Sequence, residues 1–281
     1  MKHYIPILTV AGSDSSGGAG IQADIKTISA IGCYAMSAIT AITAQNTTGV
    51  RAIQGIDPDI VSDQIDMVCT DIPPMGAKTG MLFSTDIVMA VSRAFRRHAI
   101  QNLVVDPVMV STSGSLLIDR DAIEAMTTQL FPLATLVTPN QSEARELTGE
   151  TDPMAQALKL HDMGCRNVLL KGGDTDRTDM KVDYLYLDGE EDLISLTADA
   201  VNTNNTHGTG CTLSAAIASY LALGFDITDA TMRAKLYVTR ALQYGSRVAI
   251  GHGHGPVNHL FGPRHMKYVN TKFSKYDSEN Q

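Results

Sequence analysis

The sequence predicts one α/β domain with a mostly parallel central sheet that carries helices on both faces. Short apolar runs alternate with amphipathic segments from one end of the chain to the other, and this order is typical of β-α repeats. The residues Val104, Val105 and Val108 and the run Val168–Leu170 indicate strands that are buried on both sides. A sheet of this kind binds ligands outside the carboxyl ends of its strands.

The expected strands, in chain order, are residues 5–11, 78–81, 103–108, 136–138, 168–171 and 184–187. The expected helices are residues 20–31, a segment that opens at Asp57 with Pro58 in its first turn, and residues 85–98, 121–129, 141–148, 154–163, 210–223 and 228–248. Glycines at positions 32, 164 and 224 are expected to end three of these helices.

Composition narrows the class of protein. The chain has 281 residues, of which 44% are hydrophobic, and its formal net charge is −8. The acidic balance argues against a general nucleic-acid or membrane-surface binder, and no apolar run is long enough for a membrane span. Four cysteines without a CxxC pair fit a protein of the reducing cytoplasm. We expect one domain over residues 1–262, with residues 263–281 as an extension or a disordered tail.

The first expected strand runs into a glycine-rich turn, residues 12–20. Within it, residues 18–23 match the dinucleotide-binding pattern G-x-G-x-x-G/A. That site also needs an acidic residue about 20 positions on, and no Asp or Glu lies between Asp24 and Asp57. A nicotinamide or flavin oxidoreductase is therefore disfavoured. A turn that only packs a helix against the sheet stays open.

Two further glycine-rich segments indicate an anion site. Gly208-Thr209-Gly210-Cys211 opens an expected helix, where unpaired amides and the helix dipole attract anions. The same dipole should lower the pKa of Cys211, although a small buried core residue is the simpler interpretation of a lone cysteine. Lys171 ends an expected buried strand and precedes two glycines, so its charge lies at the ligand-binding edge or extends to solvent.

These segments carry a resemblance to a known family. The chain resembles hydroxymethylpyrimidine/phosphomethylpyrimidine kinases of thiamine biosynthesis, in the ribokinase-like superfamily, over about residues 4–262. The matching segments are AGSDSSGGAG (11–20), QADIKT (22–27), ITAQNT (42–47), KTGML (78–82), VDPV (105–108), TPNQSEA (138–144), LKGG (170–173), NTHGTGCTLS (205–214) and GHGHGPV (251–257). Ser15 departs from the family, which often has proline there. The cysteine of GTGC is informative, because sugar and pyridoxal kinases usually have aspartate there.

The resemblance implies an ATP- and Mg²⁺-dependent enzyme that phosphorylates 4-amino-5-hydroxymethyl-2-methylpyrimidine and then its monophosphate. It implies a pyrimidine site formed by Gly12, Asp24, Gln45, Met81 and Val108. It implies a metal and phosphate region with Asp106, Asn140 and Glu143, and nucleotide contacts from Lys171, Thr206, Gly208, Thr209 and Gly210. Cys211, Lys171, Gly208 and Gly210 would be the catalytic groups, with Cys211 as the base that takes the hydroxymethyl proton.

Several alternatives stay open. A pyridoxal or pyridoxine kinase of the same superfamily is the second candidate, and a pyrimidine-binding regulatory protein on the same fold is the third. The pair His252 and His254 could bind a metal or lie in a closing loop near the nucleotide. The expected partners are the pyrimidine and ATP, without nucleic acid or membrane, and related kinases suggest a homodimer.

Overall fold

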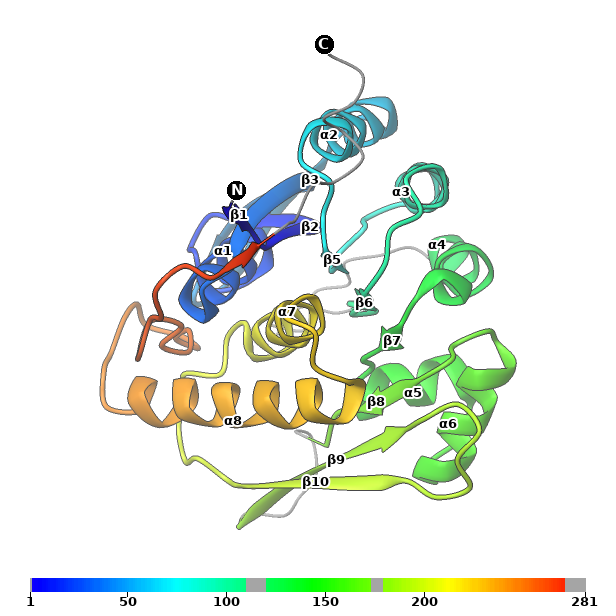
Figure 1. Cartoon of the computed structure of the whole chain (residues 1–281). Helices are drawn as coiled ribbons and strands as arrows, with labels where there is room; N and C mark the ends of the chain where they lie inside the picture. Colours follow the sequence, from blue (N-terminus) through cyan, green and yellow to red (C-terminus); the bar gives the residue numbers. More distant parts are fainter. Residues whose placement is uncertain (1, 110–119, 173–178, 271–281) are drawn as a thin grey trace.

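A central sheet organises the chain. The computed structural model describes residues 2–109, 120–172 and 179–270. Within these ranges, nine strands form one sheet in the order β10-β9-β8-β7-β6-β5-β2-β3-β4, and β1 pairs with β11 in a separate ribbon (Figure 1). The strands are β1 Lys2–Tyr4, β2 Pro6–Asp14, β3 Tyr34–Asn46, β4 Gly49–Gly55, β5 Gly76–Thr79, β6 Leu103–Val105, β7 Leu136–Val137, β8 Val168–Leu170, β9 Met180–Tyr186, β10 Ile194–Asp199 and β11 Tyr268–Asn270.

The helices in the described ranges are α1 Gly20–Ile31, α2 Pro58–Asp71, α3 Thr85–Arg97, α4 Arg120–Ala125, α5 Gln141–Thr148, α6 Pro153–Asp162, α7 Thr209–Ala222 and α8 Ile227–Gly245. After α4 the chain continues through a π-helical turn, Met126–Leu130, and a 3-10 turn, Phe131–Leu133. None of the described helices has the length and apolar character needed to cross a bilayer.

The sheet is mostly parallel, as predicted. β3, β2, β5, β6, β7 and β8 run parallel to their neighbours, whereas β4 at one edge and β9 and β10 at the other pair antiparallel. All six expected strands are present, with shifted ends. The sequence analysis missed β3, β4 and β10 of this sheet, and β1 and β11 of the separate ribbon. β3 is rich in alanine, serine and threonine, so its apolar signal is weak although it pairs with the buried strand β2.

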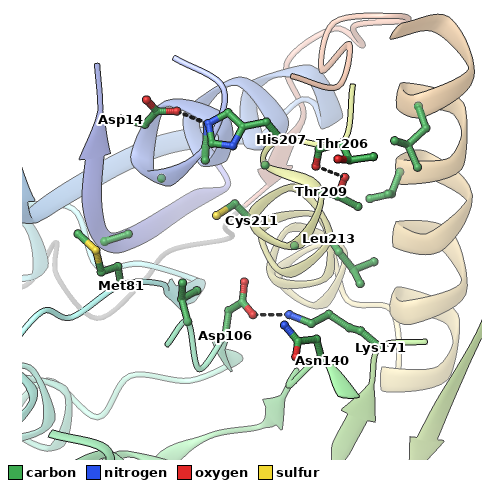
Figure 2. Close-up of a pocket in the computed structure, with 18 of the residues that line it drawn as sticks. Asp14, Met81, Asp106, Asn140, Lys171, Thr206, His207, Thr209, Cys211 and Leu213 are labelled. Atoms are coloured by element: carbon green, nitrogen blue, oxygen red, sulfur yellow. Dashed lines mark hydrogen bonds and ion pairs between the residues drawn. The ribbon is translucent and has the colours of Figure 1, made fainter. Parts of the chain in front are cut away.

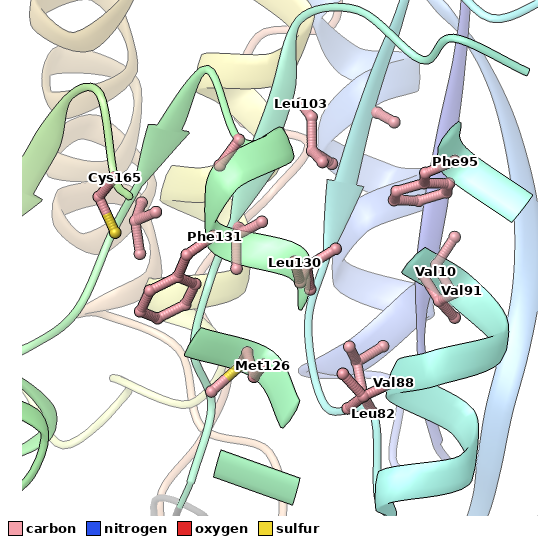
Figure 3. Packing of buried hydrophobic residues seen from close by; sticks show 14 of the residues in the cluster. Val10, Leu82, Val88, Val91, Phe95, Leu103, Met126, Leu130, Phe131 and Cys165 are labelled. Carbon is pink, nitrogen blue, oxygen red and sulfur yellow. The ribbon is translucent and has the colours of Figure 1, made fainter. Parts of the chain in front are cut away.

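Two hydrophobic layers enclose the sheet, because successive strand residues point to opposite faces. In β6, Leu103 and Val105 pack under α2, α3 and α6, whereas Val104 packs under α1, α7 and α8. Figure 3 shows the first layer, which includes Leu103 as well as Phe131 and Leu130 of the irregular turns after α4. The prediction of a sheet covered on both faces is confirmed.

Local capping sets the helix ends close to the predicted positions. The Asp57 side chain accepts from the Asp59 amide, with Pro58 as the first residue of α2. Asn140 and Glu143 form a reciprocal capping box at the start of α5. Gly32 ends α1 at φ 97°, a conformation that favours glycine.

The chain beyond residue 262 is attached to the domain as far as it is described. β11 pairs antiparallel with β1, and the amides of Arg264 and Lys267 donate to the carbonyls of Ala30 and Gly32 at 2.8 Å. Residues 271–281 of the expected extension lie outside the described residues.

A buried ion pair links α1 to β5. Lys78 Nζ lies 2.9 and 3.0 Å from the two oxygens of Asp24, and Thr9 Oγ1 donates to the same carboxylate at 2.6 Å. Both charged side chains are 0% exposed. Burial alone would lower the pKa of Lys78, but the adjacent Asp24 raises it above the ordinary value, so the lysine remains charged.

We predict that Lys78→Met destabilises the fold by about 3–5 kcal/mol, because it leaves the Asp24 carboxylate buried without its counter-charge. The double variant Lys78→Met/Asp24→Asn removes both charges and should recover part of this loss. Urea denaturation of the three proteins measures the effect. A single-variant loss below about 1 kcal/mol would contradict the importance of the pair.

A second prediction concerns pH and His259, which is 5% exposed and whose Nε2 has no hydrogen-bond partner among the described residues. Burial, together with nearby Lys26 and His207, lowers the pKa of His259 to about 4. The unfolded state, with a pKa of about 6.5, therefore binds more protons between these values. Stability should fall as pH falls through this window, by at most about 1.4 kcal/mol per pH unit from this residue.

The His259→Gln variant carries no titrating ring, so its stability should fall less steeply than that of the wild type between pH 6.5 and 4. Denaturation curves at several pH values in this window give the difference. Identical slopes for the two proteins would show that His259 does not contribute.

Candidate active site

A cavity of about 790 Å³ opens at the carboxyl ends of the parallel strands, where the sheet predicts a ligand site (Figure 2). Its walls come from the loops after β2, β5, β6, β7 and β8, from the far end of β3 and from α7 and α8. The predicted site residues that line it are Gly12, Gln45, Met81, Asp106, Val108, Asn140, Glu143, Lys171, Thr206, Gly208, Thr209, Gly210 and Cys211.

Asp24 is the exception among the residues expected around the pyrimidine. It does not line the cavity, and its carboxylate is fully buried in the pair with Lys78. A direct hydrogen bond to a ligand would require this pair to open. The sequence places Asp24 on the first turns of α1 but cannot reveal Lys78 as its partner, 54 residues away.

An ion cluster occupies one wall of the cavity. Lys171 Nζ lies 2.7 Å from Asp106 Oδ1 and 3.7 Å from Glu143 Oε2. The hydroxyls of Thr138 and Ser214 donate to Asp106 at 3.3 and 3.2 Å. Burial and the nearby Asp106 raise the pKa of Glu143 to about 6, although Lys171 opposes this shift. The two acids share one ammonium group, so this wall remains a favourable place for a cation.

Asn140 lines the same wall, but its side chain forms the N-terminal cap of α5. Its Oδ1 accepts from the Glu143 amide at 2.8 Å, and Glu143 Oε2 accepts from the Asn140 amide at 2.7 Å. This exchange holds the Glu143 side chain towards Lys171. The described residues contain no cluster of three or more His, Cys, Asp or Glu side chains that could enclose a metal ion.

The start of α7 lies beside this cluster, as predicted. A Cβ atom on Gly210 would lie 3.5 Å from Lys171 Nζ and 3.6 Å from Asp106 Oδ2. Gly208, at φ 80°, touches the first glycine-rich loop so closely that a Cβ atom would lie 1.9 Å from the Gly18 carbonyl oxygen. Gly208 therefore allows α7 to approach the loop, whereas a Cβ atom at position 210 would be in ordinary contact with the cluster.

Two amides of this helix start are available to an anion. The Thr209 amide and hydroxyl both donate to the Thr206 carbonyl, at 3.2 and 2.7 Å. The amides of Gly210 and Cys211 donate to no protein acceptor in the described ranges. The predicted anion site over residues 208–211 therefore narrows to these two amides, with the Lys171 ammonium beside them.

Cys211 corrects the expectation that the helix terminus lowers the pKa of its thiol. Burial raises this pKa to about 11, and the carboxylates of Asp24 and Asp106 raise it further. The Lys78 ammonium and the Gly20 amide oppose the shift without overcoming it. The helix terminus is visible in the sequence, whereas the burial of the sulfur is not.

Another part of the cavity lining combines an amide with apolar groups. Gln45 reaches the cavity from the end of β3, and Met81 and Val108 line it from the loops after β5 and β6. Met81 packs tightly over Gly12, where a Cβ atom would lie 2.3 Å from the Met81 methyl carbon. Gly12 is therefore required for the position of Met81.

The sequence analysis missed the pair His207 and Asp14, which joins the first loop to the start of α7. His207 Nε2 lies 2.7 Å from Asp14 Oδ2, and the amides of Ser16, Gly18 and Ala19 also donate to Asp14. Burial raises the pKa of Asp14, but these hydrogen bonds lower it well below its usual range. The two residues are 193 positions apart, so no local pattern signals the pair.

A second missed ion pair joins Lys235 of α8 to Asp183 of β9 at 2.7 Å, and Asp183 also accepts from the Gly172 amide at 2.9 Å. Both side chains line the cavity.

The segment that contains His252 and His254 is held by Thr47. The amides of His252 and Gly253 donate to the Thr47 hydroxyl, and the amide of His254 donates to the Thr47 carbonyl. This segment packs at the end of β3 and does not line the cavity.

Comparison with known proteins agrees with this geometry. The family model described as phosphomethylpyrimidine kinase matches residues 14–258. The chain is 47% identical to the thiamine biosynthesis bifunctional protein of Geobacter sulfurreducens, over 93% of this chain and 53% of that longer protein. It is 46% identical to the hydroxymethylpyrimidine/phosphomethylpyrimidine kinase of Rhizobium meliloti, over 90% of this chain and 96% of that protein.

The similar solved structures include phosphomethylpyrimidine kinase and pyridoxal kinase. The phosphomethylpyrimidine kinase of Clostridium difficile is 44% identical with a TM-score of 0.74, and covers 85% of this chain and 99% of its own. The pyridoxal kinase of Staphylococcus aureus in complex with AMP-PCP and pyridoxal is 35% identical with a TM-score of 0.83, and covers 92% of this chain and 94% of its own. The shared fold does not separate the two groups, but sequence identity and the family model do. The chain belongs to the phosphomethylpyrimidine kinase family.

Proposed function

We propose that the chain transfers the terminal phosphoryl group of ATP to 4-amino-5-hydroxymethyl-2-methylpyrimidine and then phosphorylates the monophosphate to the diphosphate, in thiamine biosynthesis. The observation that carries the proposal is a single cavity that holds both an anion site and an amide-bearing apolar wall. The anion site consists of the Gly210 and Cys211 amides and Lys171. The apolar wall consists of Gln45, Met81 and Val108.

The pyrimidine would lie against the apolar wall. Met81 and Val108 offer apolar contacts to a flat ring, and the Gln45 amide can both donate to and accept from an aminopyrimidine edge. Gly12 would act indirectly by keeping Met81 in place. Asp24 would act through Lys78, whose charge favours the thiolate of Cys211.

The phosphates of ATP would lie at the start of α7. Phosphoryl transfer needs little covalent help, and catalysis comes chiefly from positioning and from neutralising the charge of the transferred group. Lys171 and the amides of Gly210 and Cys211 would supply that positive potential. Thr206, Gly208 and Thr209 would shape the turn, since Thr209 is bonded back to Thr206 and Gly208 allows the close approach to the first loop.

The cluster of Asp106 and Glu143 fits a magnesium ion that keeps part of its water shell. Mg²⁺ is commonly held by one or two carboxylates together with substrate phosphates, and this wall offers two carboxylates beside the anion site. When bound, the ion would neutralise phosphate charge. Asn140 would contribute by holding Glu143 through the helix cap.

The resemblance to the phosphomethylpyrimidine kinase family supports three further proposals. They are a homodimer, a cytoplasmic location, and a kinase domain over residues 1–262 with residues 263–281 as an extension. The matched region, residues 14–258, falls inside the proposed domain. Sedimentation of the purified chain at several concentrations tests the dimer.

The activity is tested by ATP turnover with three separate acceptors: hydroxymethylpyrimidine, its monophosphate and pyridoxal, with products identified by mass. The proposal predicts diphosphate from the first two acceptors. Turnover of pyridoxal alone would favour the second candidate, a pyridoxal kinase. A solved pyridoxal kinase shares this fold with a TM-score of 0.83. Ligand binding without turnover of any acceptor would favour a regulatory protein.

We predict that Cys211→Ala slows the first phosphorylation by about 10²-fold or more but the second much less. The first step requires removal of a hydroxyl proton, whereas the attacking phosphate oxygen of the second step is largely ionised near neutral pH. Single-turnover rates of both steps measure the difference, and thermal melting checks that the variant is folded. Equal losses in both steps would show that Cys211 only positions the substrates.

The pH profile gives an independent readout of the same role. With its pKa raised to about 11, the thiol is largely protonated at neutral pH, so its thiolate fraction rises with pH. The rate of the first step should therefore rise between pH 7 and 9 in the wild type and rise less in Cys211→Ala. Parallel profiles for the two proteins would contradict the proton-accepting role.

A further inference from the structure

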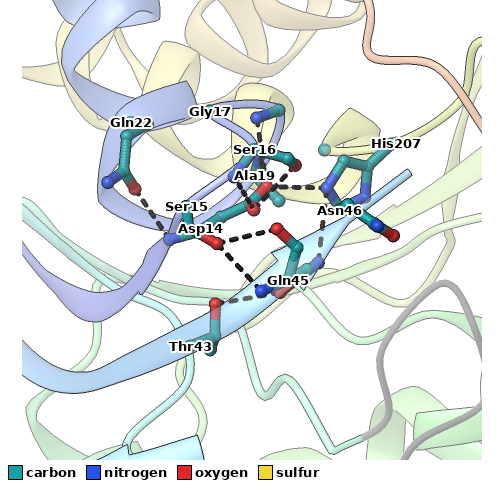
Figure 4. Close-up of polar contacts among 12 residues, drawn as sticks. Asp14, Ser15, Ser16, Gly17, Ala19, Gln22, Thr43, Gln45, Asn46 and His207 are labelled. Atoms are coloured by element: carbon teal, nitrogen blue, oxygen red, sulfur yellow. Dashed lines mark hydrogen bonds and ion pairs between the residues drawn. The ribbon is translucent and has the colours of Figure 1, made fainter. Parts of the chain in front are cut away.

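The side-chain amide of Gln45 is held between two polar neighbours (Figure 4). On one side, Thr43 Oγ1 lies 3.2 Å from Gln45 Oε1, and on the other, His207 Nε2 lies 3.5 Å from Gln45 Nε2. The backbone of Gln45 is fixed as well, because its amide donates to Ser15 Oγ at 2.8 Å and its carbonyl accepts from the same hydroxyl at 2.7 Å. The position of the amide is thus set, and its orientation depends on which neighbour can donate.

His207 can only donate in this direction. Its Nε2 lies 2.7 Å from the Asp14 carboxylate, which is ionised and accepts only. Nε2 must therefore carry a hydrogen, in either charge state of the ring, and it cannot accept a hydrogen from the Gln45 amide nitrogen. That one hydrogen is directed to Asp14, so a Gln45 N–H facing Nε2 would find no lone pair there. The amide oxygen is therefore the Gln45 group that fits beside His207.

Thr43 can only accept from Gln45. Its hydroxyl lies 2.8 Å from the Ser13 carbonyl oxygen, which has no hydrogen to give. The single proton of the hydroxyl therefore points to Ser13, and only lone pairs of Oγ1 face Gln45. The Gln45 group that faces Thr43 must be a donor.

Both neighbours demand the same orientation. The oxygen and nitrogen of an amide are nearly equal in size, so hydrogen-bond partners decide which of them lies where. A half-turn of the amide lets Nε2 donate to Thr43 and places Oε1, which has no hydrogen, beside His207 Nε2, whose own hydrogen is directed to Asp14. In the other orientation, two donors would meet at His207 and two acceptors at Thr43, or the Ser13 carbonyl would lose its donor.

We propose that Thr43 and the His207–Asp14 pair are positioning residues that fix the Gln45 amide in this one orientation and so determine which heterocycle the cavity accepts. This proposal rests on the proposed function. Once one N–H is donated to Thr43, the amide retains its second N–H and the lone pairs of its oxygen. It then offers a donor beside an acceptor, which complements a ring nitrogen next to an exocyclic amino group. A ring N–H beside an oxo group would meet the wrong partner at both positions.

The test compares two acceptors: hydroxymethylpyrimidine and its 4-oxo analogue, 5-hydroxymethyl-2-methylpyrimidin-4-one, which reverses the donor and acceptor on that edge. The readout is the ratio of kcat/KM for the amino over the oxo acceptor. In the wild type this ratio should be at least about 100, since a site built to hydrogen-bond one pattern strongly rejects the other. A glutamine free to turn would adapt to either acceptor.

The matched variants are Thr43→Val, which keeps the shape but removes the hydroxyl, and Thr43→Ser, which keeps the hydroxyl. The ratio should fall about tenfold in Thr43→Val, the equivalent of one hydrogen bond, and remain near the wild-type value in Thr43→Ser. The His207→Gln variant can donate to Asp14 but can also offer its own amide oxygen to a Gln45 N–H, so it should lower the ratio as well. Thermal melting of each variant identifies loss of folding, which would lower both rates and leave the ratio unchanged.

The possible results distinguish a failure of the proposed function from a failure of the inference about Gln45. A wild type that turns over neither pyrimidine would overturn the proposed function and this inference together. A wild type that phosphorylates the amino acceptor, with the same ratio in Thr43→Val and His207→Gln as in the wild type, would overturn the inference alone. An equal fall of the ratio in Thr43→Ser and Thr43→Val would also overturn it, because the hydroxyl would then not be the cause.

Discussion

The ammonium group of Lys171, shared by two buried carboxylates, is the interaction on which the candidate site depends. Asp106 is 1% exposed and Glu143 is 7% exposed, and two such acids could not be buried together without a counter-charge. The three residues follow β6, start α5 and follow β8, and Ser214 of α7 joins them through Asp106. The cluster therefore ties the carboxyl ends of separate strands to the helix whose first turn is the anion site.

This arrangement places charges of both signs within one small volume. The Gly210 and Cys211 amides attract an anion, while the excess carboxylate attracts a cation. Glycine at 208 is needed because α7 touches the first loop there, and Gly210 lies beside the cluster. The second half of the site, around Gln45, is held by a different set of bonds: Asp14 binds His207, and this pair ties the first loop to the start of α7. One region suits phosphoryl transfer and the other suits substrate choice.

Much of the fold follows from local patterns, and the rest depends on contacts between distant residues. Strands such as β6 and β8 are marked by valine and leucine, and helix ends are marked by Asp57, Asn140 and Gly32. β3 was missed because its small and hydroxylated residues have little apolar signal. Most candidate residues lie in one cavity, because the family motifs follow strand ends. The burial of Asp24 could not be predicted because its partner Lys78 is distant in sequence, and the pKa of Cys211 was misjudged because burial and nearby carboxylates raise it.

The most direct test of this account is a crystal structure of the chain with AMP-PCP and hydroxymethylpyrimidine bound. The account predicts the terminal phosphate within about 3 Å of the Gly210 and Cys211 amides and the Lys171 ammonium. It also predicts the amino group of the pyrimidine at Gln45 Oε1 and its hydroxymethyl group near the Cys211 sulfur. Phosphates bound away from α7, or a pyrimidine that does not contact Gln45, would contradict it.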